Sequence, residues 1–223
     1  MATTKKTVSK KKLIDDDHII SKYMDYVLEY QATPKNVFSF CKTNTIEEAD
    51  FYSFFGSFGN LRQEIWVKFF DNVKQTISKD ESYPTYSDKN KLLALYFSLF
   101  ELLTLNRSYV LFSLKENEQG LKNLKDLKLF RDAFKAFINQ IIAENPKKDF
   151  VRLDKITKPV FSEGAWIQFL LLLKYWMEDS SKGFEKTDIL IEKSVNTVVD
   201  LLDTKPLESL IDLGKFLWKE KGM

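Results

Sequence analysis

The chain of 223 residues carries 34 Lys and Arg against 32 Asp and Glu, and 44% of its residues are hydrophobic. The near balance of charge excludes a strong overall attraction to nucleic acid or anionic membranes, so any electrostatic binding surface must be local. The hydrophobic content excludes a disordered chain. Cys41 is the single cysteine, which excludes an internal disulfide, and we expect a cytoplasmic protein in a reducing compartment.

The first twelve residues, MATTKKTVSKKK, are polar and rich in lysine, and are predicted to be a flexible tail. They are followed by LIDDDHII and not by the long apolar stretch of a secretory signal. The longest apolar run, from Phe169 to Leu173, is far shorter than the roughly 20 apolar residues of a membrane-spanning helix. We therefore predict a soluble protein without membrane insertion.

The N-terminal part has the spacing of helices. The chain has only 7 Gly and 5 Pro, and its apolar residues recur at steps of three and four, which predicts an all-α protein. Asp15 to Asp17 favour a helix start, Pro34 fits the first turn of a second helix, and Gly56 ends a third. The predicted helices cover about residues 16–30, 34–42, 46–55 and 61–77.

The rest of the chain has the pattern of a helical bundle. A polar segment over residues 78–90, which contains Pro84, is predicted to join the N-terminal part to this bundle. Helices are expected at about 88–105, 107–114, 121–144, 161–179, 186–203 and 207–219. Residues 144–159 form the main predicted loop between them.

Apolar residues of the second to fourth helices follow a family pattern. The positions in register are Val37, Phe40, Cys41, Ile46, Phe51, Tyr52, Phe54, Phe55 and Leu61. With the helix order, they resemble the TetR family of one-component bacterial repressors. The segment YWMEDSSKGFEKTDILIEKSVNTVVDLL, residues 175–202, resembles the last two helices of TetR-like proteins from Bacteroidetes-type bacteria.

The resemblance implies an all-α, TetR-like fold in which an N-terminal three-helix helix-turn-helix head is joined by a linker helix to a C-terminal helical bundle. The expected parts are a flexible basic tail over residues 1–12, the head over 13–60, the linker helix over 61–78, and a helical ligand-binding and dimerisation domain over 79–223. It also implies that the heads of a homodimer bind DNA.

The head departs from the family pattern at the positions that would meet DNA. Thr45 replaces the turn glycine, Glu47 replaces the capping serine, and Phe58 replaces the lysine placed against the DNA backbone. Glu48 and Asp50 replace small or hydroxylated residues. DNA affinity comes largely from Lys and Arg that neutralise phosphates, so these acids oppose binding. Their alternative role is to stabilise a helix start through its dipole, by roughly 0.3–1 kcal/mol each.

Several residues remain candidates for DNA contact. The family phosphate contacts carry over to Asn36 and Tyr52, and the full candidate set is Lys35, Asn36, Lys42, Tyr52 and Ser53. The lysines at 5, 6, 10, 11 and 12 could reach a minor groove as an arm, or could form a solvated terminus. The aromatic stripe of Phe51, Phe54, Phe55 and Phe58 fits a packed core, and base stacking is its alternative.

Signatures of catalysis are missing from the sequence. His18 is the only histidine, so a zinc site or a Ser-His or Cys-His relay cannot be assembled from the usual residues. Neither a phosphate-binding glycine loop nor a dinucleotide fingerprint occurs. We expect a protein that is not an enzyme and that has no metal or cofactor.

Two sets of residues in the bundle are candidates for binding. Apolar faces of separate helices would line a pocket for an apolar small-molecule effector, with an ordinary filled core as the alternative; its residues are Tyr96, Phe100, Phe134, Phe137, Trp166 and Phe169. The last two long helices are apolar on more than one face, and in the resembling family they pair across a two-fold axis. The predicted dimer interface comprises Leu172, Trp176, Ile189, Val195 and Val199.

Two functions follow. The first is a TetR-like transcriptional regulator, a homodimer with a DNA-binding head and a body that binds an apolar effector. The second is a protein of the same fold with a degenerate head that does not bind DNA, and which acts as a binding module for a lipid, another hydrophobic small molecule or a protein. The acids of the third helix favour the second function, but the family resemblance favours the first, and the first is the function that we predict.

Overall fold

The computed structural model describes residues 14–115, 124–143 and 157–202. Within these ranges the chain is helical and has no strand, as the predicted all-α fold requires. Two compact units divide it, residues 1–65 and 66–223. The lysine tail, most of the loop at 144–159 and the predicted helix at 207–219 lie outside the described residues.

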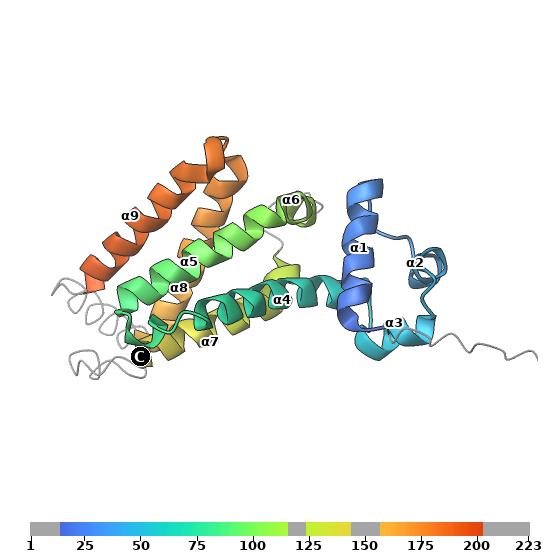
Figure 1. The fold of residues 1–223 in the computed structure, drawn as a ribbon, viewed down its shortest axis with the longest axis horizontal. Coiled ribbons are helices and arrows are strands. Elements are labelled where there is room, and N and C mark those ends of the chain that lie inside the picture. The colour runs from blue at the N-terminus through green and yellow to red at the C-terminus, as the bar shows by residue number, and fades with distance from the viewer. Residues whose placement is uncertain (1–13, 116–123, 144–156, 203–223) are drawn as a thin grey trace, which may run out of the picture. The chain divides into compact units, whose positions relative to one another are not determined.

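The first unit, here called the head, begins with three helices, α1 (Asp16–Tyr30), α2 (Val37–Asn44) and α3 (Glu48–Phe54) (Figure 1). Asp15 caps α1, because its carboxylate accepts the amide N–H of His18 at 2.8 Å. The second helix begins later than its predicted start at Pro34. Asn36 explains the difference: its backbone is extended and its side chain accepts the amide N–H of Ser39 at 2.8 Å, which fixes the helix start.

The turn between α2 and α3 passes through Thr45, whose φ of 58° and ψ of 39° place it in the left-handed region. Its amide N–H still donates to the carbonyl of Cys41, so the turn closes α2 as a glycine would. A β-branched residue is strained there, because its Cβ crowds the backbone. The next helix follows Glu47, which makes no side-chain capping bond.

Aromatic rings fill the core of the head. Phe40 and Phe51 are fully buried, one from α2 and one from α3. Phe58, the first residue of α4 (Phe58–Ser78), packs against both, at ring-centroid distances of 5.5 and 5.4 Å, and stacks on Tyr23 of α1 at 5.6 Å. Edge-to-face and stacked pairs at these distances add to the burial energy.

The second unit, here called the body, contains the rest of α4 and the helices α5 (Asp88–Leu105), α6 (Arg107–Lys115), α7 (Lys128–Ala143), α8 (Thr157–Glu178) and α9 (Glu185–Leu202). α7 packs against α8, and α5 against α9. A short 3-10 turn, Lys125–Leu127, precedes α7 where one continuous helix over 121–144 was predicted. The core of the body includes Phe70, Leu99, Phe130, Leu173 and Ile191.

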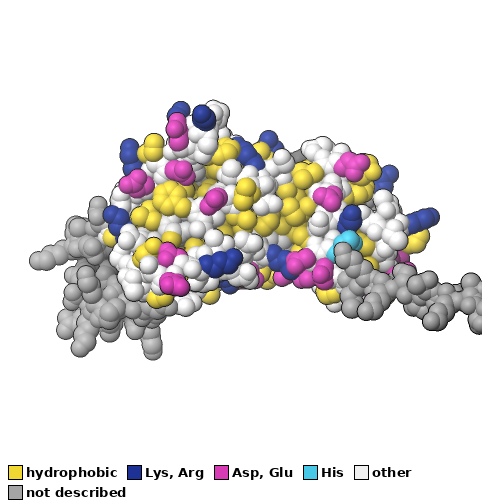
Figure 2. Space-filling model, viewed as in Figure 1, with side chains coloured by type: hydrophobic (Ala, Val, Ile, Leu, Met, Phe, Trp, Pro, Cys, Tyr) yellow, Lys and Arg dark blue, Asp and Glu magenta, His cyan; other side chains and the backbone are white. Residues whose placement is uncertain are grey.

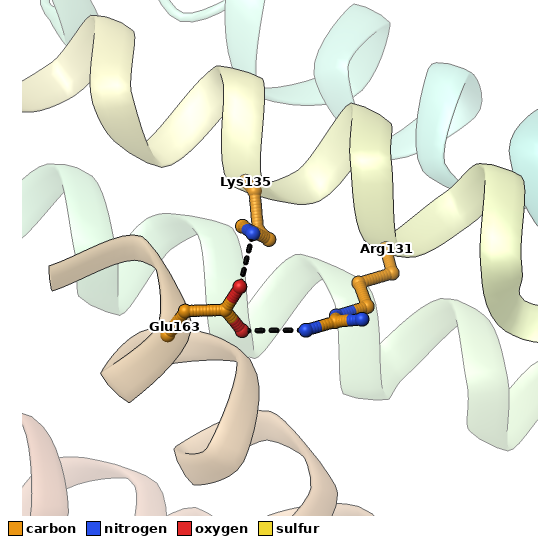
Figure 3. A network of polar contacts seen from close by, with 3 residues as sticks. All are labelled: Arg131, Lys135 and Glu163. Carbon is orange, nitrogen blue, oxygen red and sulfur yellow. Dashed lines mark hydrogen bonds and ion pairs between the residues drawn. The ribbon is translucent and has the colours of Figure 1, made fainter. Parts of the chain in front are cut away.

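A charged contact joins α7 to α8 at the surface. Glu163 of α8 lies between Arg131 and Lys135 of α7 and forms ion pairs with both (Figure 3). The Arg131 Nη2 to Glu163 Oε2 distance is 2.7 Å. The hydrogen bond from Lys135, and then that from Arg131, hold the pKa of Glu163 below its ordinary value. Because the three side chains are partly exposed, we expect about 0–1 kcal/mol of stabilisation from each pair.

A second polar cluster fixes the end of α8. The guanidinium of Arg107 donates to the carbonyls of Trp176 and Met177 at 3.0 and 3.1 Å and lies 4.3 Å from the Trp176 ring centroid. Asp179 follows, and its carboxylate accepts hydrogen bonds from the amides and hydroxyls of Ser181 and Thr187. The cluster therefore caps the end of α8 and holds the connection to α9.

Candidate functional site

Candidate DNA-contacting residues of the head are largely committed to local contacts. Asn36 caps α2, and the hydroxyl of Ser53 donates to the carbonyl of Asp50 at 2.7 Å. Lys42 is exposed, with its ammonium 5.9 Å from the ring centroid of Phe38. Lys35 and Tyr52 are also exposed. All five candidates are exposed, and Lys35, Lys42 and Tyr52 are those whose side chains do not make these two hydrogen bonds.

Phe58 occupies the position at which the resembling family has a lysine. Its ring lies among the buried aromatic residues of the head, as described above. Phe58 is half-buried, so a lysine here would lose these ring contacts and place part of its side chain against the rings. The loss of the lysine is therefore part of the packing of this head.

The charge of the described part of the head is unfavourable for phosphate binding. Residues 14–65 contain nine Asp and Glu and four Lys and Arg, a net charge of −5 with His18 neutral. Burial raises the pKa of the Cys41 thiol, and Glu48 and Asp50 raise it further, which indicates a negative potential that reaches from α3 to α2. DNA binding needs the opposite sign.

Three aromatic side chains of α2 and α3 lie at the surface instead of in the core. Phe38 is 60% exposed and Tyr52 is 53% exposed, and Phe54 is also exposed. Of the predicted aromatic stripe, Phe51 and Phe55 are buried and Phe54 is not. Tyr52 and Phe54 are two residues apart on α3, so they point to different sides of the helix.

In the body, the predicted pocket residues lie together in the core. Phe134 and Phe169 are fully buried, and Trp166 lies 5.9 Å from Phe134 and 5.2 Å from Phe169 between ring centroids. Phe100 contacts Phe169, and Phe137 is partly buried against Phe70. These rings contact one another, so an effector that enters among them must displace or rearrange some of them.

One neutral polar chain crosses this apolar core. The hydroxyl of Tyr96, fully buried on α5, lies 3.0 Å from the carbonyl of Ala165 and 3.3 Å from Gln168 Oε1 of α8. The Gln168 amide donates to Ser194 Oγ of α9 at 2.9 Å. Burial raises the pKa of Tyr96, so its hydroxyl stays protonated at neutral pH. These groups can exchange hydrogen bonds with an uncharged ligand.

The residues predicted for the dimer interface are divided between core and surface. Leu172, Trp176 and Val195 are buried inside the single chain, Val199 is half-buried, and Ile189 is exposed. Trp176 contributes to the end of α8 through its indole N–H, which donates to Thr104 Oγ1 at 3.0 Å. Leu172, Trp176 and Val195 cannot form an outer surface without opening the core.

The exposed apolar residues of α8 are a different set. Ile167, Leu171 and Tyr175 are spaced by four residues and form one stripe along the helix, and Leu171 is 65% exposed. We call them the α8 stripe. The sequence contains the signal for it: once Trp166, Phe169, Leu173 and Trp176 are assigned to the core, positions 167, 171 and 175 lie on another face. Other exposed apolar residues of the body lie on α5, α7 and α9, and Figure 2 shows hydrophobic side chains at the surface over α5 and α9.

Among the described residues, no group of three or more His, Cys, Asp or Glu could hold a metal ion. In the same part of the chain, no helix is both long enough and apolar enough to cross a membrane. Residues 91–217, more than half of the chain, match the family described as Tetracyclin repressor-like, C-terminal domain. A comparison with curated proteins gives no match.

Proposed function

The chain belongs to the tetracycline-repressor-like family, and we propose that it is a homodimeric regulator of that family whose body binds an apolar, uncharged effector. The observation that carries the effector class is the core of the body. The rings around Phe134, Trp166 and Phe169 are apolar, and the hydrogen-bonding chain of Tyr96, Gln168 and Ser194 is neutral. A charged ligand would be buried there without an opposite charge, which is costly.

The α8 stripe supports the homodimer. Ile167, Leu171 and Tyr175 place apolar surface on the outside of a helix that already supplies core residues from its other faces. Two copies of such a stripe can meet across a two-fold axis, because an isologous interface uses the same residues from both chains. The proposed interface is therefore centred on Leu171 and includes Ile189 as a candidate from α9.

For the head, two targets are open to a member of this family. DNA is the first, with Lys35, Lys42, Tyr52 and the N-terminal lysines as candidate contacts. The second candidate is a head that does not read DNA through α3, and two observations favour it: the net charge of −5 over residues 14–65, and the ring of Phe58 in place of a lysine. We propose the second, and we propose a binding role without catalysis.

The effector class can be tested with two dyes that share one aromatic framework. N-phenyl-1-naphthylamine is neutral, and its sulfonated analogue, 1-anilinonaphthalene-8-sulfonate, is an anion. We expect the full-length protein to bind the neutral dye at least about ten times more tightly, a difference of about 1.4 kcal/mol. Equal affinity for the two dyes, or no binding of the neutral dye, would contradict the proposed effector class.

A further inference from the structure

The polar chain of Tyr96, Gln168 and Ser194 in the body has a fixed direction of donation. The hydroxyl of Ser194 donates to the carbonyl of Ile191 at 3.1 Å, so the Ser194 oxygen is an acceptor for its other neighbour. That neighbour is the N–H group of the Gln168 amide, at 2.9 Å. The oxygen of the same amide, Gln168 Oε1, lies 3.3 Å from the hydroxyl oxygen of Tyr96. Gln168 therefore presents an acceptor, and not a donor, to Tyr96.

The single hydrogen of the Tyr96 hydroxyl has two acceptors beside it. The hydroxyl oxygen lies 3.0 Å from the carbonyl oxygen of Ala165 and 3.3 Å from Gln168 Oε1. Hydrogen bonds from a hydroxyl to an oxygen usually measure about 2.5–3.0 Å, so we assign the hydrogen to Ala165. Gln168 Oε1 and Tyr96 Oη then face each other with lone pairs, and each can accept a further hydrogen bond. Two acceptors at this distance can share one donor.

This acceptor pair lies between the apolar core and the surface of the body. Tyr96 is fully buried, and its ring centroid lies 6.2 Å from that of Phe134. Gln168 and Ser194 are half-buried, on two helices that pack against each other, α8 and α9. A ligand whose apolar part contacts the rings of the core can therefore bring a polar group at one end to Tyr96 Oη and Gln168 Oε1.

We propose that the effector is an apolar molecule that carries a hydroxyl group, and that this hydroxyl donates its hydrogen to Gln168 Oε1 and Tyr96 Oη. A ligand that can only accept would place its own oxygen against two acceptors, which costs binding free energy. Gln168 then determines specificity, and Ser194 positions the Gln168 amide. The inference rests on the proposed function, since it specifies the effector of the same site.

The test compares the binding of 2-naphthol and 2-methoxynaphthalene to the full-length protein by equilibrium dialysis. Both probes are neutral and have one oxygen, but only 2-naphthol can donate a hydrogen. The measured quantity is the affinity for 2-naphthol divided by that for 2-methoxynaphthalene, and comparing this ratio between two proteins cancels the different hydration of the probes. Gln168→Met keeps the length of the side chain and removes the acceptor, so we expect it to lower the ratio at least about tenfold.

Three further variants separate the acceptor from its surroundings. Ser194→Ala removes the oxygen that fixes the Gln168 amide, so it should also lower the ratio, and it provides a second route if Gln168→Met does not fold. Tyr96→Phe leaves Gln168 Oε1 in place, so the preference for 2-naphthol should remain. The matched control is Gln75→Met, at an exposed position of α4, which should leave the ratio unchanged. Circular dichroism checks that each variant is folded.

Two results would overturn the proposal. One is a ratio that neither Gln168→Met nor Ser194→Ala lowers. The other is a rise in the affinity for 2-methoxynaphthalene in Tyr96→Phe, which would show that Gln168 faces Tyr96 with its N–H group. The neutral dye N-phenyl-1-naphthylamine is measured on the same samples. If the wild type binds the dye and the ratio does not depend on Gln168, only the hydroxyl assignment fails; if it binds neither the dye nor the probes, the proposed function fails as well.

Discussion

At the scale of single residues, Thr45 is the most strained position described in the head. A left-handed conformation costs an L-residue such as Thr45 about 1–2 kcal/mol of folding free energy, and glycine does not pay this cost. Glycine is more flexible in the unfolded chain, however, and this flexibility destabilises the folded state by about 0.5–1 kcal/mol. We expect Thr45→Gly to raise the free energy of unfolding by about 0.5–1 kcal/mol, measured by urea denaturation. The control Thr43→Gly, inside α2, should lower it. A loss of stability in Thr45→Gly would contradict the strain at the turn.

Asp179 gives a pH-dependent prediction at the same scale. Burial alone would raise its pKa, but hydrogen bonds from Thr187 and Ser181 outweigh burial and hold the pKa well below its ordinary value. The stabilisation is therefore complete above the unfolded pKa of about 3.9 and is lost as the pH falls toward the folded pKa. We expect Asp179→Asn to lower the free energy of unfolding at pH 7 by about 1–3 kcal/mol.

The measurement is urea denaturation of wild type and Asp179→Asn at pH 7 and at about pH 3. The gap between the two proteins should shrink at the lower pH. Asp132→Asn, at an exposed position of α7, should differ from wild type by less than about 0.5 kcal/mol at pH 7. A gap that is unchanged at low pH would show that the carboxylate charge of Asp179 is not what stabilises the end of α8.

At the scale of elements, the α8 stripe predicts where the chain self-associates. We expect Leu171→Glu to weaken the dimer at least about 100-fold, because two charges would be buried per symmetric interface. Light scattering after size exclusion measures the mass. The matched control is Leu105→Glu on α5, which is also exposed in the single chain and should leave the dimer intact. A dimer that survives Leu171→Glu and dissociates with Leu105→Glu would move the interface to α5.

The helices differ in how well the sequence predicts their ends. α1 and α5 have the predicted bounds, because Asp15 and Ser87 are strong capping residues directly before them. The start of α2 was predicted too early, at Pro34, since Asn36 competes as a cap and its extended backbone delays the helix. The 3-10 turn before α7 leaves no comparable mark in the apolar spacing.

The candidate sites depend on which helix faces are covered by neighbouring helices, and the apolar pattern of one helix does not contain that information. The apolar pattern identifies α8 as a helix with several apolar faces, but it does not say which face the neighbouring helices cover. Three of the residues predicted for the dimer interface are buried within the chain: Leu172, Trp176 and Val195. The exposed apolar residues of α8 are Ile167, Leu171 and Tyr175. The role of Phe58 depends in the same way on Tyr23, which is distant in sequence.

At the scale of the whole molecule, a head whose residues 14–65 carry a net charge of −5 is linked in one chain to a body of the tetracycline-repressor-like family. Coupling between the two requires that an effector in the body and a partner of the head favour the same state. The neutral dye can be titrated with and without duplex DNA, and mutual changes in affinity would measure that coupling.

The central claim, that this head does not read DNA through α3, is tested most directly by fluorescence anisotropy of the full-length protein with genomic and mixed-sequence duplexes over about 50–200 mM salt. We expect no sequence-selective binding, and at about 150 mM salt an affinity no tighter than the non-specific range of about 10⁻⁴ to 10⁻⁶ M. Selective binding with a Kd of about 10⁻⁸ M or tighter at that salt concentration would contradict it.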